Sequence, residues 1–276
     1  MTWFSSQNPY ELVLSKTHGI KPVGLVYGNC YFGHYYPFVN YNANGFIKAL
    51  DNLTNQAQSL GAHLITNVRL SLHKFHNKRY KAFDYTMTGT ALKIENYSEV
   101  KQPLITTLSV IEIVRLIEAN FYPISILIFS DLNWVTGYTI PSSASGFGNT
   151  ESVKLNKQIE DLKSKCNDFL KLKAKEHNGK YVIGKQDHLN FISAGLKAQY
   201  PRFKPSDINM DGALGVSGYF LIMSSIASVV GRIKNATGNK LDIKSVLDLS
   251  SETPFKTGIS NMNNPSIFEK ILAEND

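Results

Sequence analysis

Two histidines three residues apart, His73 and His76 in the run LSLHKFHN, are the side chains best suited by type to metal chemistry, since imidazole nitrogens bind zinc and copper. The run alternates apolar and polar residues as a strand does, and residues three apart on a strand point to opposite faces. Both histidines reach one ion only if a turn starts near Lys74. The nearest further ligands in the sequence are Cys30, His34 and His63. We therefore expect no metal cofactor, and a metal-binding or metal-sensing protein with a zinc or copper site at His73 and His76 is the alternative.

A cluster of basic residues surrounds these histidines and opposes a divalent cation through like-charge repulsion. Its members are Lys74, Lys78, Arg79 and Lys81. Residues 1–102 hold ten Lys and Arg against five Asp and Glu, whereas residues 103–276 hold nineteen against seventeen, so much of the net charge of +7 lies near this cluster. A basic hairpin tip can meet phosphate or an acidic partner. Such tips are more often only solvated, and we do not expect nucleic acid as a partner.

Sequence patterns typical of catalysis are missing. The chain contains no GxSxG, HExxH, P-loop or GxGxxG pattern. Glu11 and Glu112 are related by the repeat described below, and we expect them to face water on short helices. The sequence therefore predicts a protein that is not an enzyme and has no catalytic residues.

The segment NCYFGHYYPFVNYNANGF, residues 29–46, concentrates aromatic side chains between an expected strand and an expected helix. The candidate binding or interface residues in it are Tyr31, Phe32, Tyr35, Tyr36, Phe38 and Tyr41. Loops rarely carry this much aromatic surface without burying it. Three readings stay open: a loop packed on its own domain, a subunit interface, or a stacking platform for a ligand or nucleic acid.

An internal repeat organises the chain. FSSQNPYELVLSKTHGIKPVGLVYGNC, from Phe4, aligns without a gap to ITTLSVIEIVRLIEANFYPISILIFSD, from Ile105, at an offset of 101. Asn8 and Ser109 share a slot and both suit a helix N-cap. Gly19 and Asn120 share another and both tolerate the left-handed conformation that stops a helix. The spacing predicts helices over 9–18 and 110–119, each followed by an apolar strand.

A second, amphipathic helix repeats at an offset of 109. Its apolar stripe is Phe46, Leu50, Leu53, Ala57 and Leu60 in the first copy and Leu155, Ile159, Leu162, Cys166 and Phe169 in the second. Cys166 is therefore expected in the core. The closing strands, 81–94 and 219–230, are aligned by pairing Met87 with Met223. The twenty uncharged residues 212–231 are long enough to cross a bilayer, but their Gly and Ser content favours buried strand, and we do not expect a membrane partner.

Composition and termini limit the class of protein. Two cysteines cannot build a disulfide framework, and the N-terminus lacks the pattern of a signal peptide, so we expect a cytoplasmic protein. We predict a first domain over residues 1–102, a degenerate second copy with insertions over 103–235, and a C-terminal tail over 236–276. The tail carries a helical candidate at 266–274, and it either docks on a neighbouring chain or packs on its own domain.

The first copy resembles the YbjQ-like family, often labelled a heavy-metal-binding domain. The most telling segments are AQSLGAHLITNV and TGTALKI, and the second copy matches over residues 104–131. The resemblance implies an α+β fold of two tandem dodecin-subunit-like domains, each a helix packed on a curved antiparallel sheet. It also implies homo-oligomeric rings, typically pentamers, and supplies no catalytic residues. We therefore expect a non-enzymatic, ring-forming assembly or binding protein that contacts itself, or a protein partner, through the aromatic segment or the tail.

Overall fold

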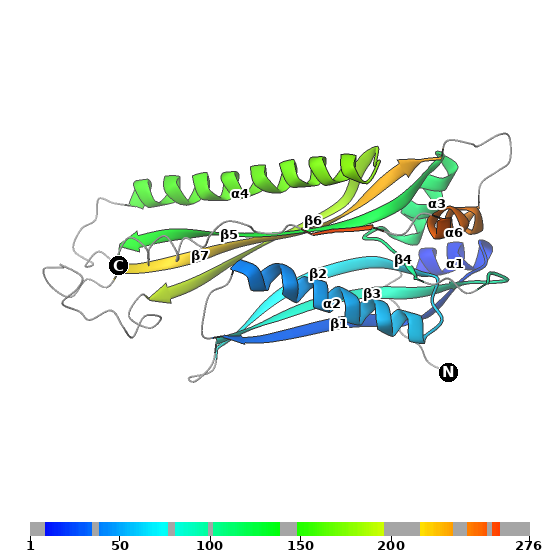
Figure 1. The fold of residues 1–276 in the computed structure, drawn as a ribbon, viewed down its shortest axis with the longest axis horizontal. Helices are drawn as coiled ribbons and strands as arrows, with labels where there is room; N and C mark the ends of the chain where they lie inside the picture. The colour runs from blue at the N-terminus through cyan, green and yellow to red at the C-terminus, as the bar shows by residue number, and fades with distance from the viewer. Residues whose placement is uncertain are drawn as a thin grey trace, which may run out of the picture.

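The computed structural model describes residues 9–34, 39–76, 81–98, 102–138, 148–195, 216–233, 242–252 and 256–259. The fold is α+β and holds two four-stranded sheets (Figure 1). Sheet 1 has the order β1-β3-β2-β4 and sheet 2 the order β6-β7-β5-β8. Among the described strands, β4 and β8 pair in parallel and the other pairs are antiparallel.

The two halves of the chain hold the same five elements in the same order. Repeat 1 consists of α1 (Pro9–Thr17), β1 (Ile20–His34), α2 (Val39–Ser59), β2 (Leu64–His76) and β3 (Lys81–Ile94). Repeat 2 consists of α3 (Val110–Glu118), β5 (Phe121–Tyr138), α4 (Gly148–Glu176), β6 (Tyr181–Gly195) and β7 (Val216–Arg232). The strand β4 (Leu104–Ile105) leads into repeat 2, and α6 (Ile243–Glu252) and β8 (Lys256–Ile259) follow it.

Irregularities of the backbone recur at equivalent positions in the two repeats. A bulge follows Pro22 in β1 and Pro123 in β5, at the offset of 101. A second bulge follows Thr66 in β2 and Ile183 in β6, at an offset of 117. Left-handed residues match as well, in the pairs Gly19 and Asn120, Gly61 and Asn178, and Asn67 and Gly184. Bulges and left-handed residues set where a strand bends, so both sheets bend at the same places.

The strand pairings correct the predicted alignment of the closing strands. Thr90 of β3 lies opposite Leu25, and Ser228 of β7 lies opposite Ile126, so β3 and β7 match at an offset of 138. Met87 is therefore equivalent to Ser225 and not to Met223. An error of two residues keeps every side chain on its own face of the sheet, which is why apolar alternation alone does not reveal it.

The short helices predicted at 9–18 and 110–119 are confirmed as α1 and α3. Ser109 caps α3 in a capping box, where its hydroxyl accepts from the Glu112 N–H and the Glu112 carboxylate accepts from the Ser109 N–H. The expectation that Glu11 faces water is wrong, because this side chain is buried. Helices α1 and α3 contact each other, which takes one side of α1 out of solvent.

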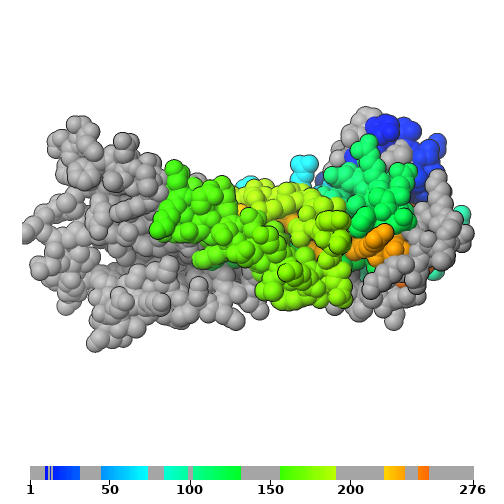
Figure 2. Space-filling model, turned by 90° about the horizontal axis from the view of Figure 1, so that it is seen from above, coloured from blue at the N-terminus to red at the C-terminus, as the bar shows by residue number. Residues whose placement is uncertain are grey.

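Helix α4 runs along the outer side of sheet 2, and sheet 1 with α2 lies on the other side of sheet 2 (Figure 1). Helix α2 packs on β1 and β3 and also contacts β5, so both repeats cover it, while Lys48, Asp51 and Asn55 on its remaining side are exposed. Helix α4 covers the outer face of sheet 2 through an apolar cluster that includes Leu162 and the buried Cys166, as predicted. In the view from above, α4 faces the viewer, and α1, α3 and α6 gather at one end of the molecule (Figure 2).

The uncharged run 212–231 is strand where the structure describes it, since β7 covers 216–232 and residues 221–230 are buried. No helix within the described ranges is long and apolar enough to span a membrane. The C-terminal segment packs on its own chain: Ile243, Val246 and Leu247 of α6 join a cluster with both repeats, and β8 adds to the edge of β5. The helical candidate 266–274 lies outside the described residues.

Candidate functional site

One face of sheet 1, here called the open face, is turned away from α2 and carries exposed and half-buried side chains from three strands. On β1 it holds Leu25, Tyr27, Asn29 and Tyr31; on β3, Asp84, Thr86 and Thr88; on β2, Arg69, Ser71 and His73. The strand register sets them in rows, with Tyr27, Thr88 and Arg69 in one row. The next row holds Asn29, Thr86 and Ser71, and the row after it holds Tyr31, Asp84 and His73.

Hydrogen bonds order the polar centre of the open face. The Asn29 side-chain amide donates to the Asp84 carboxylate, which also accepts from the Thr86 hydroxyl at 3.2 Å. Cys30 points to the opposite, α2-facing side, where burial raises the pKa of its thiol. Cys30 is therefore a packing residue, whereas Asn29, Asp84 and Thr86 lie on the open face.

Strand β1 lies at the edge of sheet 1, and side chains of α2 cover this edge. The Tyr27 N–H donates to the side-chain amide oxygen Oε1 of Gln56 at 2.6 Å, and the Asn52 side-chain amide donates to the Asn29 backbone carbonyl at 2.7 Å. These two amides lie one turn apart on α2 and satisfy outward-pointing groups of β1. The equivalent edge of repeat 2, on β5, is covered by β8 instead.

Most predicted site residues do not form one described surface. Tyr31 is on the open face and is 58% exposed. The predicted loop 29–46 is wrong in extent, because β1 continues to His34 and α2 begins at Val39. Phe32 therefore lies on β1 and Tyr41 on α2, with no described side-chain placement. Tyr35, Tyr36 and Phe38 fall outside the described residues.

The basic cluster lies at the far end of the β2–β3 hairpin. Lys74 is on β2 and Lys81 on β3, with side chains that the structure does not describe, while Lys78 and Arg79 fall outside the described residues. His73 is exposed and lies opposite Asp84, and β2 runs unbroken through position 76. Among described residues, no three His, Cys, Asp or Glu side chains group as metal ligands do.

Comparison of the two repeats identifies residues that sequence analysis did not: equivalent apolar residues are exposed in repeat 1 and buried in repeat 2. Leu25 and Tyr27 are 49% and 56% exposed, whereas their equivalents in β5, Ile126 and Ile128, are fully buried. These two isoleucines pack with α2 and the α2-facing side of sheet 1. The face of sheet 2 equivalent to the open face is thus an interface with repeat 1.

That joint between repeats also has a polar anchor. Ser228, buried in β7, has its hydroxyl 2.9 Å from the Thr106 and Thr107 hydroxyls and accepts the Thr107 N–H at 2.9 Å. The segment that holds Thr106 simultaneously bonds to the edge of β2, where Thr106 N–H donates to the Ile65 carbonyl. One short segment therefore connects sheet 1 to sheet 2.

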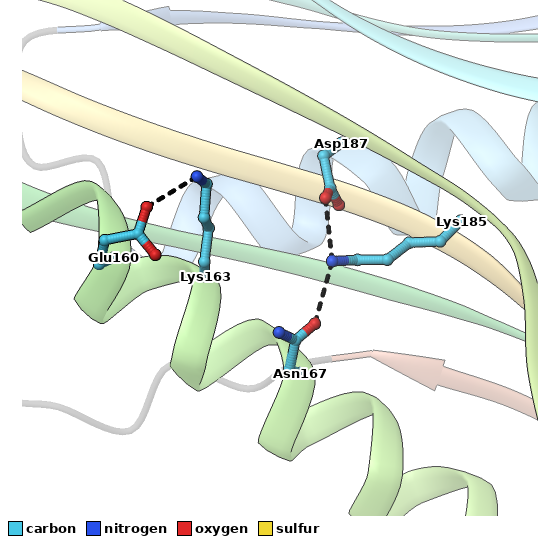
Figure 3. A network of polar contacts seen from close by, with 5 residues as sticks. All are labelled: Glu160, Lys163, Asn167, Lys185 and Asp187. Atoms are coloured by element: carbon cyan, nitrogen blue, oxygen red, sulfur yellow. Dashed lines mark hydrogen bonds and ion pairs between the residues drawn. The ribbon is translucent and has the colours of Figure 1, made fainter. Parts of the chain in front are cut away.

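The outermost layer, α4, is charged on its free side. Its exposed charged residues with described side chains are Lys157, Glu160, Asp161, Lys163, Lys165, Asp168, Lys171, Lys175 and Glu176. Figure 3 shows Glu160 paired with Lys163 at 2.8 Å, and Lys185 of β6 bridging Asn167 and Asp187. The equivalents of Lys185 and Asp187 in β2 are Val68 and Leu70, which are buried under sheet 2. No second sheet covers α4 within the described chain.

Comparison with known protein families, with curated proteins and with solved structures finds no match for this chain.

Proposed function

We propose that the chain is a non-enzymatic, homo-oligomeric assembly protein built of two tandem YbjQ-like, dodecin-subunit-like domains. The carrying observation is the difference in burial between Leu25 and Tyr27 on the open face and their equivalents Ile126 and Ile128 in the joint between repeats. A surface that one repeat buries against its neighbour is left exposed on the other. The simplest partner for it is the second repeat of another copy.

The geometry of this contact is head-to-tail. Within the chain, the α2 side of repeat 1 meets the sheet face of repeat 2; between chains, the α4 side of one copy would meet the open face of the next. Such heterologous contacts form a closed ring when the rotation between units closes and a filament when it does not. The resemblance of the sequence to a ring-forming family supports the closed ring.

The contact between copies is expected to be more polar than the joint within the chain. Asp84 on the open face replaces the equivalent Ile222 of the joint, and Thr88 replaces Ile226. On the helix side, the exposed Lys163 of α4 replaces the buried Thr54 of α2. Both surfaces have changed in the same direction, which is expected if they meet each other. Tyrosine, enriched on the open face, is also a residue that protein interfaces favour.

The test is native mass spectrometry of the full chain at low ionic strength, together with the variant Tyr27→Lys and the control Tyr27→Phe. A discrete multimer is expected for the parent and for Tyr27→Phe, which keeps the aromatic area. Tyr27→Lys is expected to weaken association about tenfold or more, corresponding to roughly 1.4 kcal/mol. A monomeric parent overturns the proposal, and a mass excess matching zinc or copper supports the metal-binding alternative at His73 and His76.

A further inference from the structure

Among the described strands, the outer edge of β6 is the clearest unpaired edge that the proposed assembly leaves unexplained. Sheet 2 begins with β6, which pairs only with β7 among the described strands. Its equivalent in repeat 1, β2, does not end its sheet, because β4 adds to its other side. An unpaired edge of this length presents N–H and C=O groups that can bind another strand.

The way β4 binds β2 is fully defined. Leu64 lies beside Leu104 and Ile65 beside Ile105, in parallel. The Leu104 N–H donates to the His63 carbonyl at 3.0 Å. Both β4 residues are almost fully buried, with 2% and 1% of their surface exposed. This segment therefore supplies both backbone pairing and apolar burial at the start of repeat 2.

The β6 edge has the same local geometry as the β2 edge. Lys180 N–H donates to the Val230 carbonyl at 2.8 Å, as His63 N–H donates to the Leu92 carbonyl at 2.8 Å. At the offset of 117, Tyr181 and Val182 stand where Leu64 and Ile65 stand in β2. Tyr181 is 51% exposed, whereas Leu64 is fully buried. The β6 edge lacks the cover that β4 gives to β2 among the described residues.

The chain contains a segment matched to this edge. At the offset of 101, Leu104 and Ile105 correspond to Trp3 and Phe4, which precede α1 as β4 precedes α3. Thr106 corresponds to Ser5 in the same alignment. Residues 1–8 lie outside the described part of the chain, and their two large aromatic residues have the apolar character that the buried β4 positions require.

We propose that Trp3 and Phe4 of one copy add in parallel to the β6 edge of a second copy, with Trp3 beside Tyr181 and Phe4 beside Val182. The inference rests on the proposed homo-oligomer and specifies its connection. Repeat 1 of one molecule then packs on repeat 2 of the other molecule in the same way as repeat 2 packs on repeat 1 within the chain. The same contact places Leu25 and Tyr27 of the incoming copy toward α4.

The experiment is disulfide cross-linking between separately purified Trp3→Cys and Tyr181→Cys variants, mixed, oxidised and separated without reductant. Facing positions on neighbouring strands bring their Cβ atoms within disulfide range. The control mixture pairs Trp3→Cys with Leu189→Cys, an exposed position further along β6. At least tenfold more covalent dimer is expected for the Tyr181 mixture than for the control or for either variant alone.

A second variant lacking residues 1–7 separates the two proposals. Native mass spectrometry is expected to show that this deletion lowers the multimer fraction of the otherwise assembling protein. An assembled parent with no preferential cross-link and an unaffected deletion variant overturns the strand addition and leaves the proposed function standing. A double variant with both Trp3→Cys and Tyr181→Cys tests whether the contact lies within one chain. A cross-link within this double variant, together with no cross-link in the mixture, also overturns the strand addition between copies. A monomeric parent overturns both proposals.

Discussion

The Ser228 hydroxyl shows how much one small side chain contributes to the joint between repeats. It contacts two threonine hydroxyls and one backbone N–H, and all three residues are buried. A buried hydroxyl satisfied on several sides stabilises the structure chiefly because its loss leaves partners unsatisfied. The segment around Thr106 and Thr107 is held to sheet 2 through this atom.

Replacing Ser228 with Ala is expected to lower the free energy of unfolding by about 1–3 kcal/mol, since the Thr107 N–H loses its acceptor in a buried site. Urea denaturation followed by circular dichroism measures the change. The control is Ser59→Ala, whose hydroxyl donates to the Gln56 carbonyl on the exposed side of α2. Equal small losses for both variants would contradict the role given to Ser228.

A pH dependence is expected at the start of α6. Burial opposes ionisation of Asp242, but hydrogen bonds from the Ser245 N–H and hydroxyl, helped by Lys244, lower the pKa of its carboxyl below the ordinary value. A lowered folded-state pKa means that the charged cap stabilises the protein above the unfolded pKa, and that this contribution is lost as the pH falls through the folded pKa.

Asp242→Ala is expected to cost about 1 kcal/mol at neutral pH, the usual value of a lost N-cap. Asp242→Asn keeps an oxygen that can accept the capping hydrogen bonds, but it has no carboxyl group that changes its charge with pH. The difference in unfolding free energy between the parent and Asp242→Asn should therefore shrink as the pH is lowered below 4. A difference that stays constant or grows on acidification would disprove the assignment.

At the scale of elements, β1 and α2 approach each other closely at Gly28. A Cβ atom on Gly28 would overlap the Ala49 carbonyl oxygen and lie 2.5 Å from the Leu53 nitrogen. Glycine is required here by space and not by backbone conformation. The helix therefore sits close enough for Asn52 and Gln56 to reach the outer edge of β1.

Gly28→Ala is expected to push α2 away from β1 and to destabilise the fold by about 1–3 kcal/mol, the usual cost of overpacking. Thermal unfolding monitored by circular dichroism measures it. Gly24→Ala is the matched control on the same strand, because its Cβ would meet only the flexible end of Leu60 at 3.2 Å. A loss at Gly24 as large as that at Gly28 would contradict the argument from space.

For the whole molecule, the polar character of the two free surfaces predicts a salt-dependent assembly. The open face holds Arg69 and Asp84, and α4 holds charges of both signs, so the contact that we propose between copies would be partly electrostatic. Raising ionic strength from about 0.05 M to about 1 M shortens the Debye length to roughly 3 Å and is expected to lower the multimer fraction. Light scattering measures it, and an assembly that strengthens with salt would indicate a mainly apolar contact.

Much of the architecture follows from local pattern. The stop signals at Gly19 and Asn120, the cap at Ser109 and the apolar stripe through Leu162 and Cys166 predict helices that the structure contains. These features depend on backbone sterics and on the period of a helix, which neighbouring residues alone decide. The same holds for the uncharged run that becomes β7.

The candidate site followed from the sequence only in part. The sequence predicts Tyr31 as a candidate, and the structure places it on the open face. Leu25 and Tyr27 lie in an alternating strand whose pattern is typical of a core strand. In the sequence they differ from core residues only in that the other repeat has Ile126 and Ile128 at the equivalent positions. Strand alternation shows that two faces exist and not which face another layer covers.

Tertiary structure alone decided which strand faces are buried and where the C-terminal elements dock. The same strand pattern is exposed in repeat 1 and buried in repeat 2, because burial depends on which layer packs above it and that layer comes from the other half of the chain. The docking of α6 and β8 was equally hidden, since a strand edge is chosen by contacts between residues more than a hundred positions apart. The sequence by itself determined the repeated elements and their ends. The packing of sheet 1, α2, sheet 2 and α4 on one another decided which surfaces stay exposed, because long-range burial has no local signature.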